Sequence, residues 1–302
     1  MNYINLYSRF LDRNLKPKRK LIVVFDCSNG TTGIVLKELF RKSRVKSPKS
    51  KVKAILINDR PDGNFPAHGP NPLIDGAMDQ LRRTVIRRKA DLGVAFDADG
   101  DRVFFTDNRG RIVAAEEMGF LLEQNLRPPF VTSENASWRL KKFKAKNSKS
   151  KAVYMSRVGH YYFKQVMRAH KASLGCEPSG HFYHKDFFYC DSGIFTAMRA
   201  INAVSASPDG LAARIDELPV YYRSGEINYK VADKKKAIRQ IEARYRKQAT
   251  HVSKLDGVTM EFGNEWWFNV RASNTENLLR LNMEATRKET LKRRLTEIGK
   301  ML

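Results

Sequence analysis

The sequence predicts an α/β fold of consecutive βαβ-type domains with mixed, mainly parallel sheets, followed by a C-terminal α+β domain. Short continuous apolar runs, such as residues 21–25 and 92–96, have the composition of parallel strands that are buried on both faces. Segments with a helical spacing of apolar residues alternate with these runs, as they do in βαβ units. A length of 302 residues allows two or three domains of about 100–200 residues each.

The first predicted domain covers residues 1–114 and opens with a short amphipathic helix, because apolar residues recur at helical spacing over residues 4–14. Pro17, inside the basic run 16–20, ends this helix. Strands and helices then alternate around a loop that is rich in proline and glycine. In order, we expect a strand at 21–25, a helix at 34–40, a strand at 52–57, the loop at 61–72, a helix at 74–89 and a strand at 92–96.

Two further domains are expected, at residues 115–215 and 216–302. The second should contain three helices, near residues 116–125, 160–170 and 192–205. The third combines helices and strands without a βαβ pattern, so it is predicted to be α+β. Its expected elements are a helix at 233–249, a pair of strands within 255–272 and a closing helix at 287–301.

The composition favours a globular cytoplasmic protein. Hydrophobic residues make up 42% and aromatic residues 10% of the chain, which is enough for packed cores. No apolar run approaches the roughly 20 residues that span a membrane, and the N-terminus does not resemble a signal peptide. Three widely spaced cysteines, Cys27, Cys176 and Cys190, form neither a metal motif nor a disulfide framework. We therefore expect a reducing, cytoplasmic location and no membrane partner.

The formal net charge of +24 is unusually high. Clustered lysine and arginine residues neutralise phosphates, so such a charge suits a nucleic-acid-binding protein. However, the basic runs at 16–20 and 139–146 do not alternate regularly with aromatic residues, as a base-stacking surface would. We therefore favour a solvated basic surface over a nucleic-acid-binding one. A positive field also attracts phosphorylated small molecules.

The segment that follows the predicted strand 92–96 has the pattern of a divalent-metal loop. Asp97, Asp99 and Asp101 alternate over a tight turn, so all three carboxylates can point inward, and Mg²⁺ prefers such hard oxygen ligands. Gly100 permits the sharp turn, and Arg102 brings a planar fork that suits a phosphate. An acidic surface turn is the alternative, but three aspartates side by side repel one another without a cation.

Two other metal-loop families can be compared with this segment. An EF-hand needs glycine at its sixth position and glutamate at its twelfth, where this chain has Arg102 and Asn108, so an EF-hand is excluded. A haloacid-dehalogenase-type phosphatase also has Asp-x-Asp after a strand, but that family has threonine or valine where Asp101 stands. It remains an alternative enzyme class.

Two more loops carry polar groups. Residues 175–181 place Glu177, Ser179 and His181 in a tight Gly/Pro loop, where they can meet sugar hydroxyls and a transferring proton. An ordinary turn with a satisfied histidine is equally consistent with that loop. A second loop, which follows the strand-like residues 266–270, has the groups of a phosphate cradle: Arg271, Ser273, Asn274 and Thr275. Asn274 and Thr275 also suit a helix cap.

Together, and in this order, the three loops resemble the α-D-phosphohexomutases, the family of phosphomannomutases and phosphoglucomutases. The segments 65–72, 158–164 and 226–228 also resemble parts of that family, so the resemblance covers nearly the whole chain. It implies a transfer of phosphate between C1 and C6 of a hexose phosphate, with Mg²⁺ as cofactor. The residues it implies are Asp97, Asp99 and Asp101 for the metal, Arg102, His160 and His181 for catalysis, Glu177 and Ser179 for the sugar, and Arg271, Ser273, Asn274 and Thr275 for the phosphate.

The chain departs from the family at three places. The family's first domain carries a phosphorylated serine in a Thr-Ala-Ser-His-Asn-Pro-like motif, and no Ser-His-Asn occurs in this sequence. Ser28 is a poor substitute, because the family has no nucleophile at that position. Asn135 stands where the family has a substrate-binding lysine, and Glu276-Asn277 stands where proline is usual. The chain therefore resembles the family's domains two to four without the phosphoserine domain.

These departures leave several functions open. A separately encoded phosphoserine domain can complete the mutase, docking on the apolar residues Ile4, Tyr7, Phe10 and Leu11 of the opening helix. Alternatively, the chain is a catalytically inactive protein that binds sugar phosphates. A haloacid-dehalogenase-type phosphatase and a basic nucleic-acid-binding protein are the remaining alternatives.

Overall fold

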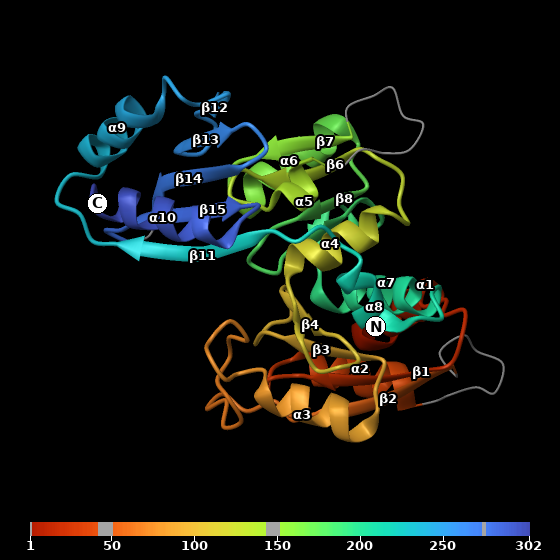
Figure 1. Ribbon diagram of the computed structural model, residues 1–302. Coiled ribbons are helices and arrows are strands. Elements are labelled where there is room, and N and C mark those ends of the chain that lie inside the picture. Colours follow the sequence, from red (N-terminus) through yellow and green to blue (C-terminus); the bar gives the residue numbers. More distant parts are fainter. Residues whose placement is uncertain (1, 42–50, 143–151, 274–275) are drawn as a thin grey trace. The chain divides into compact units, whose positions relative to one another are not determined.

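The computed structural model describes residues 2–41, 51–142, 152–273 and 276–302 (Figure 1). The chain divides into two compact units. Unit 1 contains the described residues of 2–130, residue 152 and residues 167–218. Unit 2 contains residues 131–142, 153–166 and the described residues of 219–302. Each unit is described by itself.

A five-stranded sheet in the order β2-β1-β3-β4-β5 forms the centre of the first part of unit 1. Its strands are β1 (Leu21–Asp26), β2 (Val52–Ile57), β3 (Leu92–Phe96), β4 (Val103–Thr106) and β5 (Ile112–Val113). β1 pairs in parallel with both β2 and β3, whereas β4 runs antiparallel to β3 and β5 antiparallel to β4. The sheet is therefore mixed, which agrees with the predicted fold class.

Side chains on both faces of β1 are buried, which explains its continuous apolar sequence. On one face, the ring of Phe25 lies 5.6 Å from that of Phe40 in helix α2 (Thr32–Arg41). On the other face, Val24 belongs to a cluster with Leu81 and Val85 of helix α3 (Asp79–Arg88). Figure 1 shows α2 and α3 beside this sheet. Alternate residues of β1 thus face different helices.

Helix α3 begins five residues later than the sequence predicts. The expected helix at 74–89 includes Gly76, whose φ of +79° is incompatible with a right-handed helix. The helix begins at Asp79 and ends before Lys89, which adopts the left-handed conformation. The proline- and glycine-rich loop is correspondingly longer than expected.

The rest of unit 1 joins three short antiparallel strands to several helices. The elements are α1 (Tyr3–Asn14), α4 (Ala115–Glu123), β8 (Leu174–Cys176), β9 (Phe182–His184), the 3-10 helix η2 (Lys185–Phe187), β10 (Cys190–Asp191), α7 (Gly193–Ser205) and α8 (Gly210–Asp216). β8 pairs with β9 and β9 with β10, both antiparallel.

Helix α1 packs within unit 1, contrary to its expected role as an exposed docking face. The Phe10 ring lies 5.3 Å from that of Phe195 in α7, and the Tyr7 hydroxyl lies 2.9 Å from Ser192 Oγ. Leu11 is fully buried, and of the four predicted docking residues Ile4 alone is exposed, at 41%. The apolar stripe that suggested a partner is covered by the chain's own aromatic residues.

Unit 2 is built on an antiparallel sheet in the order β11-β15-β14-β13-β12. Its strands are β11 (Tyr222–Tyr229), β12 (His251–Ser253), β13 (Val258–Phe262), β14 (Trp266–Ala272) and β15 (Leu279–Ala285). Helices α9 (Lys234–Tyr245) and α10 (Lys288–Gly299) contribute Ile241, Tyr245, Leu291 and Ile298 to its core. An antiparallel sheet with helices is the α+β arrangement predicted for the C-terminal domain.

The remaining elements lie between residues 130 and 170. They are β6 (Phe130–Ser133), α5 (Trp138–Lys141), β7 (Val153–Ser156) and α6 (His160–His170). Within the described parts of the chain, no helix combines the length and apolarity needed to cross a membrane.

Candidate functional site

The three aspartates of the predicted metal loop lie together at the end of β3. Asp97, Asp99 and Asp101 each offer a carboxylate oxygen within 4.8 Å of the other two. The turn between them depends on Gly100, which has a φ of +77°. A Cβ atom at Gly100 would lie 2.3 Å from Thr32 Cγ2. Glycine is therefore required both by the backbone conformation and by the space available.

Asp97 is the buried member of this cluster. Its Oδ1 accepts hydrogen bonds from the backbone N–H of Gly100 at 3.1 Å and of Arg102 at 3.2 Å, and its Oδ2 accepts one from Arg102 Nε at 2.5 Å. Burial raises the pKa of the Asp97 carboxyl, and the hydrogen bond and charge of Arg102 partly oppose this shift. The carboxylate oxygens of Asp99 and Asp101 beside the buried carboxylate of Asp97 form a set of hard donors that fits Mg²⁺.

The predicted sugar loop lies against the metal loop inside unit 1. Val103 N donates to the Gly180 carbonyl at 3.0 Å, and Arg102 and His181 form an isolated antiparallel bridge. His181 Nε2 lies 3.5 Å from Asp101 Oδ2. The two loops, separated by about 75 residues in the sequence, therefore form one polar surface.

Within the sugar loop, the three predicted side chains contact one another. The Ser179 hydroxyl donates to Glu177 Oε2 at 3.1 Å and lies 2.9 Å from His181 Nδ1. Glu177 is 3% exposed. This chain of hydrogen bonds holds the imidazole with Nε2 toward the metal loop, where it can exchange a proton with a bound group.

Two polar residues of this surface were not indicated by the sequence. Asp191, from β10, brings a carboxylate oxygen within 4.8 Å of ligand atoms of Asp101 and His181. Asn71 accepts a hydrogen bond from Arg102 Nη1 at 3.2 Å through its side-chain oxygen. Asn71 lies in the segment 65–72, whose resemblance to the family gave it no role, and Asp191 lies in none of the segments that the sequence singled out. Only proximity in the fold reveals both.

The other predicted site residues that the structure describes belong to unit 2. Arg271, at 5% exposure, donates from Nη2 to Glu226 Oε2 at 3.2 Å. Ser273 N donates to the Leu278 carbonyl at 2.9 Å, and Ser273 Oγ accepts from Glu276 N at 3.2 Å. Asn274 and Thr275 lie outside the described residues. Among the described residues of this loop, Arg271 is therefore buried and paired with Glu226, and Ser273 is held by Leu278 and Glu276.

His160 occupies the first position of helix α6 in unit 2. The turn that precedes it is held by Asp256, whose Oδ2 accepts a hydrogen bond from Val158 N at 3.0 Å. Gly159, between Val158 and His160, has a φ of +122°, a conformation that favours glycine. Asp256 is a further residue that the sequence did not indicate.

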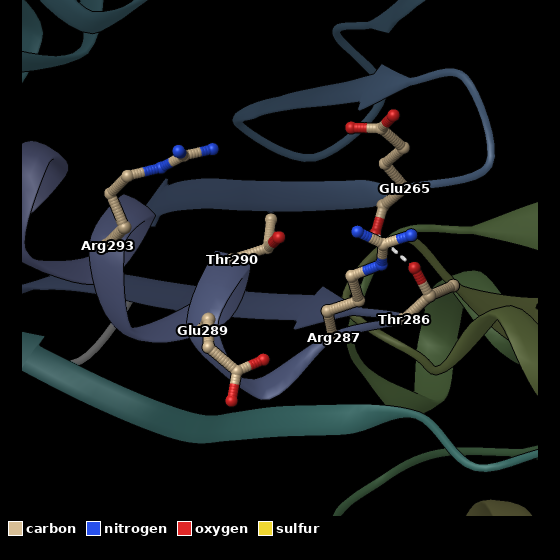
Figure 2. A pocket seen from close by; sticks show the side chains of 6 residues that line it. All are labelled: Glu265, Thr286, Arg287, Glu289, Thr290 and Arg293. Carbon is tan, nitrogen blue, oxygen red and sulfur yellow. Dashed lines mark hydrogen bonds between the residues drawn. The ribbon is translucent and has the colours of Figure 1, made fainter.

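A surface pocket of about 690 Å³ lies at the start of α10 in unit 2. Figure 2 shows its six lining side chains, Glu265, Thr286, Arg287, Glu289, Thr290 and Arg293. The Thr286 hydroxyl donates to the Glu265 carbonyl at 3.2 Å. The two arginines are matched by two glutamates, and none of the predicted site residues lines the pocket. We assign it no part in the chemistry.

Three sequence models of phosphoglucomutase/phosphomannomutase domains match the chain. They are the alpha/beta/alpha domain II at residues 2–110, the alpha/beta/alpha domain III at residues 112–222 and the C-terminal domain at residues 226–300. The phosphomannomutase of Escherichia coli (strain K12) is 34% identical over 293 residues. That match covers 93% of this chain and 63% of the Escherichia coli protein.

Other relatives agree with these matches. The phosphomannomutase of Methanocaldococcus jannaschii is 32% identical over 322 residues, covering 100% of this chain and 66% of that protein. A solved phosphoglucomutase/phosphomannomutase family protein from Burkholderia thailandensis has the same fold, with a TM-score of 0.84 at 23% identity. The match covers 99% of this chain and 64% of the Burkholderia chain. The chain thus spans less than two thirds of the Escherichia coli and Burkholderia proteins.

Proposed function

Because the chain belongs to the phosphoglucomutase/phosphomannomutase family, we propose that it is a phosphohexomutase that moves a phosphate between C1 and C6 of a hexose phosphate. The observation that carries this proposal is the joining of the metal loop to the sugar loop, with His181 Nε2 3.5 Å from Asp101 Oδ2. Phosphoryl transfer requires positioning and charge neutralisation more than covalent chemistry from the protein, and both loops supply groups for these tasks.

The proposed roles follow from the positions of the side chains. Asp97, Asp99 and Asp101 would hold Mg²⁺, which when bound supplies positive charge opposite the transferring phosphate. Arg102, fixed beside the metal loop by its bond to Asp97 Oδ2, would add a second positive charge for the phosphate. Glu177 and Ser179 would accept and donate hydrogen bonds to sugar hydroxyls, as the family resemblance implies.

Proton transfer and phosphate binding complete the proposal. His181 and His160 would carry protons to and from the sugar oxygens. Arg271 and Ser273, with Asn274 and Thr275 outside the described residues, would hold the phosphate that is not being transferred. The support for Arg271 is its buried guanidinium, which suits bidentate binding of a phosphate.

The nucleophile of the family is not among these 302 residues, since the sequence contains no Ser-His-Asn. Ser28 does not replace it, because its side chain is buried and donates to the Phe96 carbonyl at 2.5 Å. We propose that the phosphorylated serine comes from a phosphoserine domain outside residues 1–302.

The test is a coupled mutase assay on purified protein with glucose 1-phosphate, Mg²⁺ and a glucose 1,6-bisphosphate primer. We expect turnover after the addition of a purified phosphoserine domain that bears Thr-Ala-Ser-His-Asn-Pro, and none with its serine-to-alanine variant. Asp99→Ala in this chain should abolish turnover, whereas Asp62→Ala, in an exposed loop, should not. If Asp99→Ala turned over the substrate as fast as the unaltered chain does, the assignment of the metal loop would be wrong.

A second candidate is a sugar-phosphate-binding protein without turnover. It is favoured by Asn135, which stands where the family has a lysine and is 7% exposed, its side-chain oxygen accepting from Ser133 Oγ at 2.6 Å. This function predicts that calorimetry detects glucose 6-phosphate or mannose 6-phosphate binding, and that no supplement produces turnover. Arg271→Ala should abolish that binding; unchanged binding would show that the phosphate loop is misassigned.

We also propose the domain division 1–114, 115–215 and 216–302. Its support is that the three family domains match residues 2–110, 112–222 and 226–300. A cytoplasmic location is proposed as well, and it is supported by Cys27, Cys176 and Cys190, which are thiols and not disulfides.

A further inference from the structure

The proline- and glycine-rich loop that precedes helix α3 is tied to the rest of unit 1 by Asn29, a residue just after β1. Asp62 N donates to the Asn29 carbonyl at 2.8 Å, and Asn29 Nδ2 donates to the Arg60 carbonyl at 3.1 Å. The Ala67 N–H donates to Asn29 Oδ1 at 3.3 Å. These contacts fix the first half of the loop, but most of the residues they hold are exposed.

The second half of the loop has a buried anchor. His68 Nε2 lies 3.1 Å from Asp26 Oδ2, and the two side chains are 8% and 0% exposed. Asp26 Oδ1 accepts from Ser28 N at 3.0 Å and from Asn58 Nδ2 at 2.9 Å. Both oxygens of this buried carboxylate thus meet donors, and His68 supplies the bond that reaches into the loop. Hydrogen bonds to a buried carboxylate are strong because water does not compete for them.

Just beyond His68, the loop touches the proposed metal loop twice. Ala98 N, between Asp97 and Asp99, donates to the Pro70 carbonyl at 3.1 Å. Arg102 Nη1 donates to Asn71 Oδ1 at 3.2 Å. The loop therefore holds both the backbone between two proposed ligands and the guanidinium beside them.

From this connection we propose that His68 is a positioning residue for the metal loop, acting through Pro70 and Asn71 on Ala98 and Arg102. The inference rests on the proposed function, because it assigns the metal loop its role. His68 itself lies outside the set of ligands. Its effect is to reduce the number of conformations open to residues 97–102, so that the carboxylates need less reorganisation when a cation binds.

The proposal is tested with Mn²⁺ as a spectroscopic probe and with hydrogen–deuterium exchange of the metal-free protein. The variants are His68→Ala, His68→Gln, whose amide nitrogen reaches the position of Nε2 and so retains a donor toward Asp26, and Asn71→Ala. Asn58→Gly is the matched control, since it removes a different hydrogen bond to the same carboxylate, and the φ of +52° at Asn58 suits glycine. Thermal melting establishes that each variant is folded.

We expect His68→Ala to raise the Mn²⁺ dissociation constant by about 10-fold, the low end of the effect of removing an outer-shell partner. Exchange should become faster in the peptide that covers residues 97–102 and stay unchanged in peptides of unit 2. His68→Gln should restore most of the affinity. Asn58→Gly should leave both readouts near those of the unaltered protein.

The combination of His68→Ala and Asn71→Ala tests the route of the effect. If His68 acts through the loop, the double variant should weaken Mn²⁺ binding by less than the product of the two single effects. A folded His68→Ala protein with unchanged Mn²⁺ affinity and unchanged exchange overturns the proposal. If His68→Ala does not fold, an unchanged Mn²⁺ affinity in Asn71→Ala overturns it instead.

Failure of the proposed function gives a different result. If the unaltered chain binds no Mn²⁺, the metal assignment is wrong, and exchange at residues 97–102 still decides whether His68 restrains the loop.

Discussion

Replacing Gly100 by alanine should destabilise unit 1 through two separable effects. The φ of +77° at this position costs an L-residue about 1–2 kcal/mol. In addition, the new Cβ would lie 2.3 Å from Thr32 Cγ2, and Thr32 is 1% exposed in the packed interior. Overpacking of this kind costs about 1–3 kcal/mol. The sum is about 2–5 kcal/mol, a large share of the stability of a typical domain.

Two other glycines of unit 1 separate these effects. Gly69 has a φ of +81°, and a Cβ atom added there would have no neighbour within 4 Å, so Gly69→Ala should show the backbone cost alone. Gly63 has open space around it and no positive φ, so Gly63→Ala should change stability by less than about 1 kcal/mol. Urea unfolding followed by circular dichroism gives the free energy of unfolding of each variant.

Thr32→Ser provides the complementary test, because serine lacks the Cγ2 atom. In a Gly100→Ala background it should recover the overpacking share, about 1–3 kcal/mol, and a double-mutant cycle measures this coupling. If Gly100→Ala costs no more than Gly69→Ala, or if Thr32→Ser recovers nothing, the close approach of Gly100 to Thr32 does not matter energetically and the reasoning fails.

Three further predictions concern buried charges. Glu284 is fully buried, and its Oε1 accepts hydrogen bonds from Trp138 N at 2.9 Å and Trp267 Nε1 at 3.1 Å. Its Oε2 lies 3.5 Å from Arg223 Nε. Glu284→Leu should lower the free energy of urea unfolding by about 2–6 kcal/mol, because Trp138 N and Trp267 Nε1 lose their acceptor. Glu284→Gln keeps an acceptor for both donors and loses only the charge opposite Arg223, so it should cost less. Burial raises the pKa of Glu123 well above 4.5, so the folded state keeps a proton that the unfolded state loses. The free energy of unfolding should therefore fall as pH rises from about 4.5 toward the folded pKa; Glu123→Gln should remove this fall, and the exposed control Glu217→Gln should retain it. The Nζ atom of Lys141 lies 3.4 Å from the centre of the Trp267 ring. Burial there lowers the pKa of Lys141 from its usual 10.5 to about 8. Between about pH 8 and 10.5 the unfolded state keeps a proton on this lysine that the folded state has lost, so the free energy of unfolding should rise with pH. Melting temperatures measured over this range should show the rise, and Lys141→Met should abolish it.

The sequence predicted the parts of the fold in which local composition and tertiary environment agree. Strand β1 has apolar residues at successive positions because helices cover both faces of its sheet. The family was recognisable from three loops because the residues of each loop are contiguous, as in Asp97 to Arg102. Contiguous residues keep their spacing whatever the rest of the chain does.

The sequence was less informative where backbone conformation or a distant partner decides. The start of α3 depends on the positive φ of Gly76, which helical periodicity does not reveal. The apolar stripe of α1 predicted a docking face, but Phe187 and Phe195 cover Phe10 at 5.7 and 5.3 Å. An amphipathic pattern shows that a face is buried, and it does not show what buries it.

The sequence by itself determined the family, the order of the loops and the three carboxylates of the proposed metal loop, Asp97, Asp99 and Asp101. Only the tertiary structure decided which side chains surround them. The bonds from His68 to Asp26 and from Asn71 to Arg102 join residues that lie 42 and 31 positions apart. A hydrogen bond depends on a few ångströms of separation in space, and folding of the sheet, not proximity along the chain, brings these groups together.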